Sequence, residues 1–265
     1  MLTIELDKGK EQIAVILKFG KQEHIESLKK GNINVEKIGY YVNLEKELGI
    51  AGIGDKYDSA TIIKDIKIED IQRSDGKILS EKEKTLINKF KILNKEDKIK
   101  VNLESHKLQD LETPIFCAMC LEKDDFVKEG DKYVFRFTKE QIQTLKKDFS
   151  DYTHVFLIDA GIFGMKIKEK AEKEGLDYKM SNIKYYDPNI NQAERINDYD
   201  NSNIIFWKRD IFKQQKEFRV AFPNTNIESR KNLLNVGDFE DCLILDKDTV
   251  LNEDFALTYP NEYFK

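Results

Sequence analysis

The residues best suited to chemistry stand close together in one late stretch of the chain, residues 212–222. If this stretch is a β-strand, its alternate side chains lie on opposite faces. The apolar face then consists of Phe218, Val220 and Phe222. The polar face then consists of Lys213, Gln215, Glu217 and Arg219. On this second face an amide and a carboxylate stand in register as a Gln-x-Glu pair.

Two interpretations of the polar row are open. A strand at the surface carries such a row simply because one of its faces borders water. A strand at the wall of a cleft would instead direct Gln215 and Glu217 at a ligand. A carboxylate in that place can stabilise positive charge that develops on a sugar ring. The second interpretation therefore predicts Glu217 as the catalytic group and Gln215 as the residue that positions an acceptor or a ribose hydroxyl.

The composition indicates a globular protein with a heavily charged surface. Of the 265 residues, 40% are hydrophobic and 35% are charged, and 49 acidic residues nearly balance 44 basic ones to give a net charge of −5. A chain of this length can bury a sizeable core. A nucleic-acid-binding protein is normally basic, so the composition carries no strong nucleic-acid signature, although a local basic groove is compatible with it.

Three features predict a cytoplasmic protein without a membrane segment. No apolar run approaches the roughly 20 residues that cross a bilayer. Residues 1–7 lack the basic start and the apolar core of a signal peptide. The three cysteines are an odd number, which suits a reducing compartment better than a disulfide framework.

The strands that must position the polar row are predicted by hydrophobic patterning. Short apolar runs bounded by turn residues predict buried strands. The clearest runs are residues 12–19, 114–121, 154–158 and 183–186. Further strands are expected at residues 32–38, 98–103, 133–137, 233–236, 242–245 and 255–257.

Helices are predicted where apolar residues recur on one face or where a capping box opens a segment. The first criterion predicts helices at residues 21–30, 40–48 and 166–174. Capping boxes, in which a Ser or Thr precedes a Glu or Gln by three residues, open helices at Ser80 and Thr138.

The order of these elements predicts one α+β domain over residues 1–265, with mixed or antiparallel sheets and flanking helices. Residues 189–203 are polar and predict a loop. Residues 49–58 form a glycine-rich loop that contains neither GxGxxG nor GxxxxGK[ST], so it is not expected to bind phosphate by either motif. Such a loop borders a binding site or simply connects two elements, and both interpretations are open.

Cys117 and Cys120 have the spacing of metal-binding cysteines. Positions three apart in a strand face opposite sides of a sheet, and the chain has no second pair of this spacing. A zinc site is therefore not expected here.

The order of short motifs resembles the ADP-ribosyltransferase superfamily. The early strand ends in Phe19-Gly20 and leads into a helix, a tyrosine pair follows at Tyr40-Tyr41, and Gln215-x-Glu217 stands on a late strand. The same order is similar to a group of bacterial and prophage proteins related to these transferases, some of them linked to phage defence. The resemblance implies NAD⁺ as the substrate, a nucleotide or macromolecule as the acceptor, and no metal.

The resemblance also implies contacts to NAD⁺ for several residues: Lys18, Gly20, Tyr40, Tyr41 and Arg219. In the diphtheria-toxin-like and poly-ADP-ribose-polymerase-like branch the first strand has His-Gly, where this chain has Phe19-Gly20. In the cholera-toxin-like branch an arginine holds NAD⁺, and Lys18 is the nearest basic residue here. The Ser-Thr-Ser signature of the middle strand is replaced by Phe116-Cys117-Ala118.

Two other classes of function compete with a transferase. Asp159 and Glu217-x-Arg219 imitate the carboxylates of a Mg²⁺-dependent nuclease, although arginine cannot act as the base that lysine supplies. Asp159 is also well placed to cap the helix that follows it, and this interpretation is favoured over a metal ligand. The alternative without catalysis is a module that binds a nucleotide or a protein, to which Trp207-Lys208-Arg209 would contribute.

Overall fold

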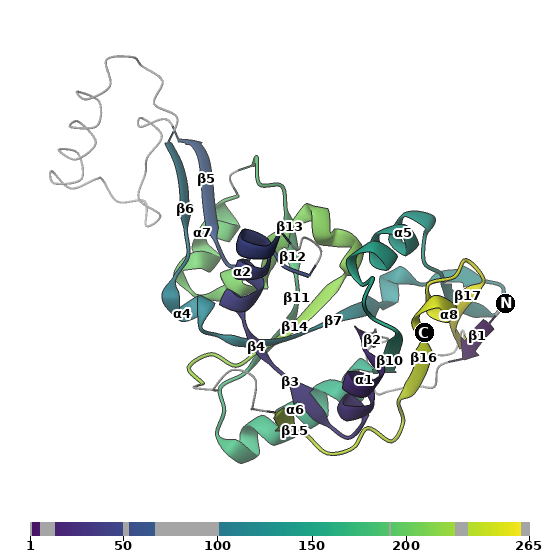
Figure 1. The fold of residues 1–265 in the computed structure, drawn as a ribbon. Helices are drawn as coiled ribbons and strands as arrows, with labels where there is room; N and C mark the ends of the chain where they lie inside the picture. The colour runs from purple at the N-terminus through teal and green to yellow at the C-terminus, as the bar shows by residue number, and fades with distance from the viewer. Residues whose placement is uncertain are drawn as a thin grey trace, which may run out of the picture.

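The computed structural model describes residues 2–5, 14–49, 53–66, 101–190, 192–225 and 233–260. In this part of the chain, antiparallel sheets are flanked by helices in a mixed α+β arrangement, as the sequence predicts (Figure 1). The predicted helix that begins at Ser80 lies outside the described residues.

A large sheet forms the centre of the molecule. Its strands, in spatial order, are β11 (Lys179–Asn182), β14 (Glu217–Ala221), β7 (Pro114–Glu122), β2 (Ala14–Gly20), β10 (His154–Asp159) and β16 (Leu243–Asp246). Every neighbouring pair is antiparallel. A short additional strand, β4 (Glu36–Lys37), also pairs with β7.

Strand alternation divides the core between the two faces of this sheet. On β2, Val15, Leu17 and Phe19 pack into one hydrophobic cluster, whereas Ile16 packs into another on the opposite face. The β-branched and aromatic residues of the apolar runs fit this arrangement because a pleated strand presents successive side chains to opposite faces. A central sheet that is covered on both faces explains why these runs are nearly continuous in the sequence.

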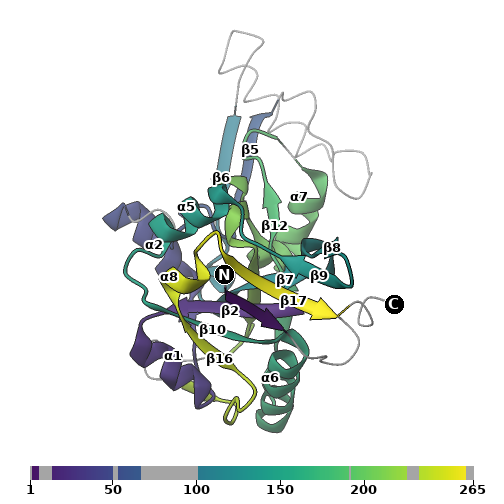
Figure 2. The same cartoon turned by 90° about the vertical axis from the view of Figure 1, so that its right-hand side faces the viewer.

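Different elements cover each face. Helices α1 (Gln22–Lys29) and α6 (Ala160–Glu174) pack on the face of Ile16 through residues such as Ile25 and Phe163. Helix α5 (Lys139–Asp148) packs on the other face through Ile142 and Leu145. Figure 2 shows α1 and α6 on the same side of the central strands.

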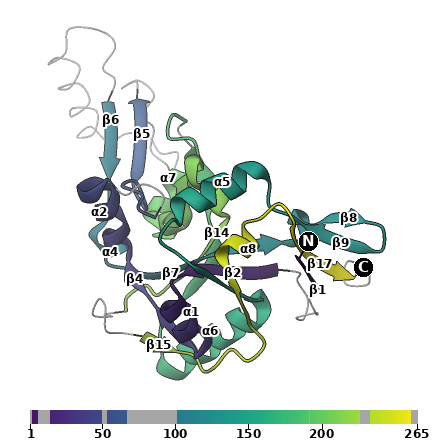
Figure 3. The same ribbon diagram turned by 45° about the vertical axis from the view of Figure 1, so that its right-hand side comes forward.

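A second sheet completes the cluster on the α5 face. It consists of β1 (Leu2–Glu5), β17 (Phe255–Pro260), β9 (Lys132–Phe135) and β8 (Val127–Glu129), in that order. Phe135, Leu257 and Tyr259 bring this sheet into contact with the core that contains Leu17. The short helix α8 (Lys247–Val250) precedes β17 and adds Val250. Figure 3 shows this sheet at one end of the molecule.

Three pairs of strands stand beside the central sheet: β12 (Lys184–Tyr186) with β13 (Trp207–Arg209), β3 (Asn32–Asn34) with β15 (Leu233–Asn235), and β5 (Thr61–Ile66) with β6 (Val101–Ser105). The β12–β13 pair is parallel. The β5–β6 pair extends away from the body (Figures 1 and 3). The remaining helices of the described residues are α2 (Ile38–Leu48), α4 (Leu108–Leu111) and α7 (Ala193–Asp200), with 3₁₀ turns η2 (Lys123–Asp125), η3 (Asn203–Phe206) and η4 (Asp210–Gln215).

One edge of β7 is shared by two strands. Met119 pairs with Glu217 of β14 and with Leu17 of β2, so these two strands lie on opposite edges of β7. Ile115 pairs with β14 and with Glu36 of β4, so β4 lies on the same edge as β2. After Leu17, β2 leaves β7 but continues to pair with β10 through Gly20. Residues 116–118 of β7 therefore border an opening between β2 and β4.

Two predicted elements are corrected by the structure. The strand predicted at 212–222 begins only at Glu217, because residues 210–215 form η4 and Lys216 has a left-handed backbone with φ of 42°. The loop predicted at 189–203 contains α7. The polar residues of α7 conceal it from hydrophobic patterning because one of them, Arg195, is buried and bonded to the carbonyl oxygens of Ala60 and Ile62.

Candidate functional site

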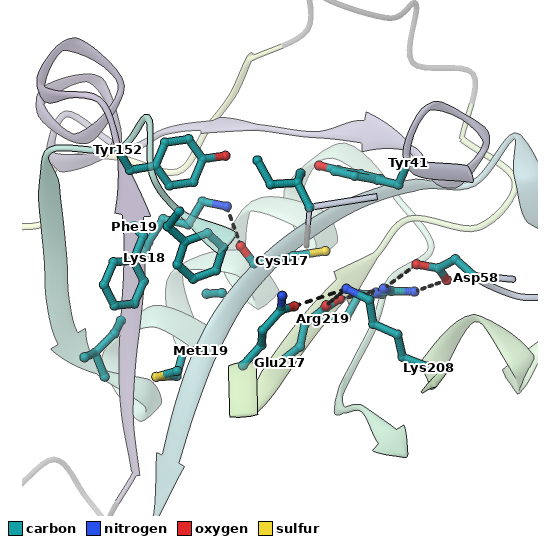
Figure 4. Close-up of a pocket in the computed structure, with 15 residues that line it drawn as sticks. Lys18, Phe19, Tyr41, Asp58, Cys117, Met119, Tyr152, Lys208, Glu217 and Arg219 are labelled. Carbon is teal, nitrogen blue, oxygen red and sulfur yellow. Dashed lines mark hydrogen bonds and ion pairs between the residues drawn. The ribbon is translucent and has the colours of Figure 1, made fainter. Parts of the chain in front are cut away.

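A pocket opens on the α5 face of the central sheet, where β2 leaves β7 (Figure 4). Its cavity volume is about 90 Å³, which is smaller than the roughly 300–1,000 Å³ of typical small-molecule sites. Its floor comes from β2, β7 and β14, and its walls come from α2, the residues after α5 and the segment before β5.

Aromatic rings line one side of the pocket. Phe149 stacks on Phe19 with ring centres 5.0 Å apart, and Tyr152 stacks on Phe149 with centres 5.5 Å apart. Tyr41 lies on the opposite side, and the hydroxyl groups of Tyr41 and Tyr152 both point toward the space between them (Figure 4). Two aromatic walls of this kind suit a ligand that contains a planar ring.

The Glu217 carboxylate is held by two cations. Its Oε2 accepts a hydrogen bond of 2.8 Å from Lys208 Nζ, and its Oε1 accepts bonds of 3.0 Å and 2.6 Å from Nε and Nη2 of Arg219. All three side chains are buried, and all three line the pocket. Glu217 is therefore an acceptor whose two oxygens are both engaged.

Arg219 is fixed more firmly than Lys208. Its Nη1 and Nη2 each donate to one oxygen of Asp58 at 2.9 Å, which makes a bidentate ion pair, and Nη1 also donates to the carbonyl oxygen of Ile205. Arg219 is only 1% exposed. A planar guanidinium with this many partners has little freedom to move.

Burial and charge act on Glu217 in opposite directions. Burial raises the pKa of a carboxyl because it disfavours the charged form, but the nearby charges of Arg219 and Lys208 outweigh this effect. The pKa of Glu217 is therefore held well below its ordinary value. The carboxylate remains ionised throughout the physiological pH range.

Gln215 forms hydrogen bonds with Lys208 and with Asp148, the residue before the pocket residue Phe149. Its Oε1 accepts a hydrogen bond of 3.3 Å from Lys208 Nζ, and its Nε2 donates one of 2.8 Å to Asp148. Asp148 is the last residue of α5 and immediately precedes Phe149. A continuous set of polar contacts thus runs from the end of α5 to Glu217.

Lys18 reaches the opening between β2 and β4. Its Nζ donates a hydrogen bond of 2.6 Å to the backbone carbonyl oxygen of Cys117 on β7 (Figure 4). Burial lowers the pKa of Lys18, and the carboxylate of Glu217 partly offsets this effect. The charged side chains that line the pocket are three cations and two carboxylates, namely Lys18, Lys208, Arg219, Asp58 and Glu217, so the lining carries a surplus of one positive charge.

Cys117 lies against Glu217 at the floor of the pocket. Burial and the neighbouring Glu217 carboxylate raise the pKa of its thiol to about 12. A thiol with this pKa is protonated at neutral pH and is a poor nucleophile. Cys120 packs into the cluster on the other face of the sheet, away from Cys117, as the strand periodicity predicts.

The structure gathers five of the seven predicted site residues around one pocket: Lys18, Tyr41, Gln215, Glu217 and Arg219. Tyr40 is 40% exposed and stands edge-on to Tyr41, outside the pocket lining. Gly20 lies at the end of β2 against Ile25, where an added Cβ would meet the Ile25 side chain at 3.0 Å. These two residues are not among those that line the pocket.

Most of the other residues that line the pocket were not identified from the sequence as site residues, among them Asp58, Phe149, Tyr152 and Lys208. Lys208 had been noted only as part of Trp207-Lys208-Arg209. Trp207 itself is buried, and its indole Nε1 donates to Asp198. Lys213, the first residue of the predicted polar row, is exposed on η4 and does not line the pocket.

The segment from Asp55 to Ile62 is held in place by buried arginines. Arg219 binds Asp58, Arg209 donates to Asp55 at 2.8 Å, and Arg195 donates to the carbonyl oxygens of Ala60 and Ile62. The later part of the glycine-rich loop, residues 53–58, is thereby fixed as a wall of the pocket, to which Ile53 and Asp58 belong.

Asp159 takes part in helix capping. Its Oδ1 accepts a hydrogen bond of 2.9 Å from the backbone N–H of Ile162 at the start of α6. Within the described residues, no group of three or more His, Cys, Asp and Glu side chains is placed to hold a metal ion. No described helix combines the length and the apolar composition that a membrane-spanning helix needs.

The chain has no significant match among protein-family models, curated proteins or solved structures.

Proposed function

We propose that the pocket binds NAD⁺ or a related nucleotide and that the protein is an ADP-ribosyltransferase-like enzyme, or a glycohydrolase, that breaks the nicotinamide–ribose bond. The observation that carries this proposal is the buried Glu217 carboxylate, held by Lys208 and Arg219 at the floor of an aromatic-sided pocket. The sequence pattern around Gln215 and Glu217 adds support through the resemblance to this superfamily. A role in phage–host conflict rests on the same resemblance.

The reaction needs a negative charge close to the ribose. When the bond between ribose C1′ and the nicotinamide nitrogen breaks, its electron pair goes to the nitrogen and the ring becomes neutral. Positive charge then develops on C1′ and the ring oxygen, where a carboxylate stabilises it. Water or a nucleophilic group of an acceptor forms the new bond to C1′ and loses a proton. Glu217 is assigned the stabilising role, and the aromatic walls are assigned to the planar ring.

A second candidate function is a module that binds a nucleotide without cleaving it. The observation that favours it is the engagement of both Glu217 oxygens by Lys208 and Arg219. Cations this close neutralise much of the charge that would otherwise act on a ribose. In this alternative, Glu217 holds two cations in place for an anionic ligand.

Nicotinamide release separates the two functions. We expect the purified protein to release nicotinamide from NAD⁺ and the Glu217→Gln variant to do so on the order of 10²-fold more slowly. The exposed Glu253 supplies a matched control, Glu253→Gln, which is expected to behave as wild type. Thermal unfolding of each variant shows whether it is folded.

The possible results differ for each class of protein. Nicotinamide release that is unchanged in a folded Glu217→Gln protein would reject the catalytic role of Glu217. A thermal shift with NAD⁺ but no turnover would identify a binding module. Loss of nucleic acid that requires Mg²⁺ and stops with EDTA would identify a nuclease instead.

A further inference from the structure

Lys208 connects Glu217 of the central sheet to the β12–β13 sheet. Arg219 lies two residues from Glu217 on the same strand, whereas Lys208 belongs to β13 in the separate β12–β13 sheet. Arg219 is already paired with both oxygens of Asp58. Within this cluster, Lys208 is therefore the cation that has no carboxylate partner other than Glu217 at ion-pair distance in the described chain.

Lys208 also sets the position of Gln215. Its ammonium group donates to Gln215 Oε1 at 3.3 Å and to Glu217 Oε2 at 2.8 Å. With Oε1 occupied, the amide of Gln215 presents its nitrogen to Asp148. One buried ammonium thus defines the orientation of the amide, the orientation of the carboxylate and the link to the residue that precedes Phe149.

We propose that Lys208 is the positioning residue of this site, which holds the Glu217 carboxylate and the Gln215 amide in one fixed arrangement beside the pocket. This inference rests on the proposed cleavage of NAD⁺. Lys208 acts through its two partners: the ammonium group fixes Oε2 of Glu217 by a hydrogen bond and, together with Arg219, favours the ionised carboxylate. A displacement of about 1 Å in a catalytic group can cost on the order of 10²-fold in rate.

Replacement of the ammonium tests the proposal. In Lys208→Met, which is similar in length and uncharged, we expect kcat for nicotinamide release to fall on the order of 10²-fold, with KM changed by less than about threefold because the aromatic walls remain. The low-pH limb of the kcat profile should also move to higher pH, since a carboxylate that loses a nearby cation is protonated more easily.

Two further variants make the result specific. Lys208→Arg keeps the charge but changes the geometry, so we expect a low-pH limb like that of wild type and a kcat between those of wild type and Lys208→Met. The exposed Lys213, which lies on the adjacent η4, gives the control Lys213→Met, expected to match wild type. If Lys208→Met does not fold, the test uses Lys208→Arg alone. A kcat of Lys208→Arg equal to that of wild type then overturns the proposal.

The inference and the proposed function can fail separately. A folded Lys208→Met protein with wild-type kcat and an unmoved low-pH limb overturns the positioning role while NAD⁺ cleavage stands. If the wild-type protein releases no nicotinamide, the proposed function fails, and NMR titration of ¹³C-labelled glutamate decides the role of Lys208. The Glu217 signal, assigned with Glu217→Gln, should titrate at higher pH in Lys208→Met, and an unchanged titration would overturn the proposal.

Discussion

Cys117 and Glu217 are neighbours on the pocket floor whose protons behave in opposite ways. The carboxyl loses its proton far below neutral pH, because two cations outweigh its burial. The thiol keeps its proton to high pH, because burial and the adjacent carboxylate both disfavour a thiolate. In the same buried surroundings, the two cations therefore favour the charged form of Glu217, whereas the charged form of Cys117 is disfavoured.

The cysteines are expected to react slowly with alkylating reagents. Burial is the main cause that raises the pKa of all three thiols, to about 12 for Cys117 and Cys120. At pH 8 we expect iodoacetamide to modify the folded protein at least about tenfold more slowly than it modifies a free thiol with a pKa of about 8.5. Mass spectrometry of the modified peptides measures this for each cysteine.

The protein unfolded in guanidinium chloride serves as the control for this labelling, and it should react at the rate of free thiols. Rapid modification of Cys117 in the folded protein would contradict a protonated thiol and would indicate that the site contains a reactive thiolate.

At the residue scale, alternation along the sequence found the site residues of the late strand but not their partners from other parts of the chain. Glu217 and Arg219 stand two apart on one strand, so periodicity brings them together. Asp58 lies 161 positions from Arg219 in the sequence, and no local pattern connects the two. Lys208 and Gln215 are separated by a 3₁₀ turn whose geometry is not encoded by a hydrophobic repeat.

Among the elements, α5 ends at the pocket, because its last residue, Asp148, accepts from Gln215 and the next residue, Phe149, belongs to the pocket lining. Its start is fixed by a capping box in which the Thr138 hydroxyl accepts from the backbone N–H of Gln141 at 3.1 Å, and the Gln141 side chain accepts from the backbone N–H of Thr138 at 2.9 Å. The sequence predicted this cap correctly because its residues are adjacent in the chain.

Removal of the cap should destabilise the protein by a measurable amount. We expect Thr138→Ala to lower the free energy of unfolding by about 1 kcal/mol, since one orphan N–H loses its partner. Urea denaturation measures the change. Gln143→Ala, at an exposed position of the same helix, is the control and should change the free energy by less than about 0.5 kcal/mol. Equal effects of the two substitutions would show that the cap does not contribute.

Prediction of helices from hydrophobic patterning failed where a polar side chain is buried in place of an apolar one. Helix α7 contains Arg195, whose guanidinium is buried and lies 3.8 Å from the centre of the Tyr186 ring. A buried arginine looks like a surface residue in a hydrophobicity pattern, so this helix was interpreted as a loop. The start of β14 at Glu217 is not predicted because the left-handed residue before it is Lys216, and lysine carries no signal for that conformation.

At the scale of the whole molecule, the buried ion pairs join separate sheets. Glu217 and Arg219 lie in the central sheet, Lys208 lies in the β12–β13 pair, and Asp58 lies just before the β5–β6 pair. Loss of one partner would leave a buried charge uncompensated, which typically costs about 3–5 kcal/mol. These contacts are consistent with cooperative folding of the parts that they connect.

The stability contributed by Glu217 should depend on pH. Its pKa in the folded protein is below the unfolded value of about 4.3. The contribution is therefore fully present above that unfolded value and is lost as the pH falls below it toward the folded value. We expect the difference in free energy of unfolding between wild type and Glu217→Gln to be largest at pH 7 and to shrink between pH 5 and pH 3.

Denaturant unfolding at several pH values measures this difference. Asp58 has a pKa that burial raises despite Arg219, so its effect has the opposite sign, but it is present in both proteins and largely cancels in the comparison. A difference that stays constant from pH 7 to pH 3 would contradict an ionised, cation-bound Glu217.

The shared edge of β7 has a consequence for how this fold can be altered. An internal β-strand normally pairs with one neighbouring strand along each edge. On this edge of β7, β2 pairs with one end and the two-residue strand β4 pairs with the other. Between the two pairings, the carbonyl oxygen of Cys117 accepts its hydrogen bond from the Lys18 ammonium group instead of from a strand. Because α2 begins directly after β4 and supplies Tyr41 to the pocket, we expect an insertion in β4 to displace that wall relative to β2.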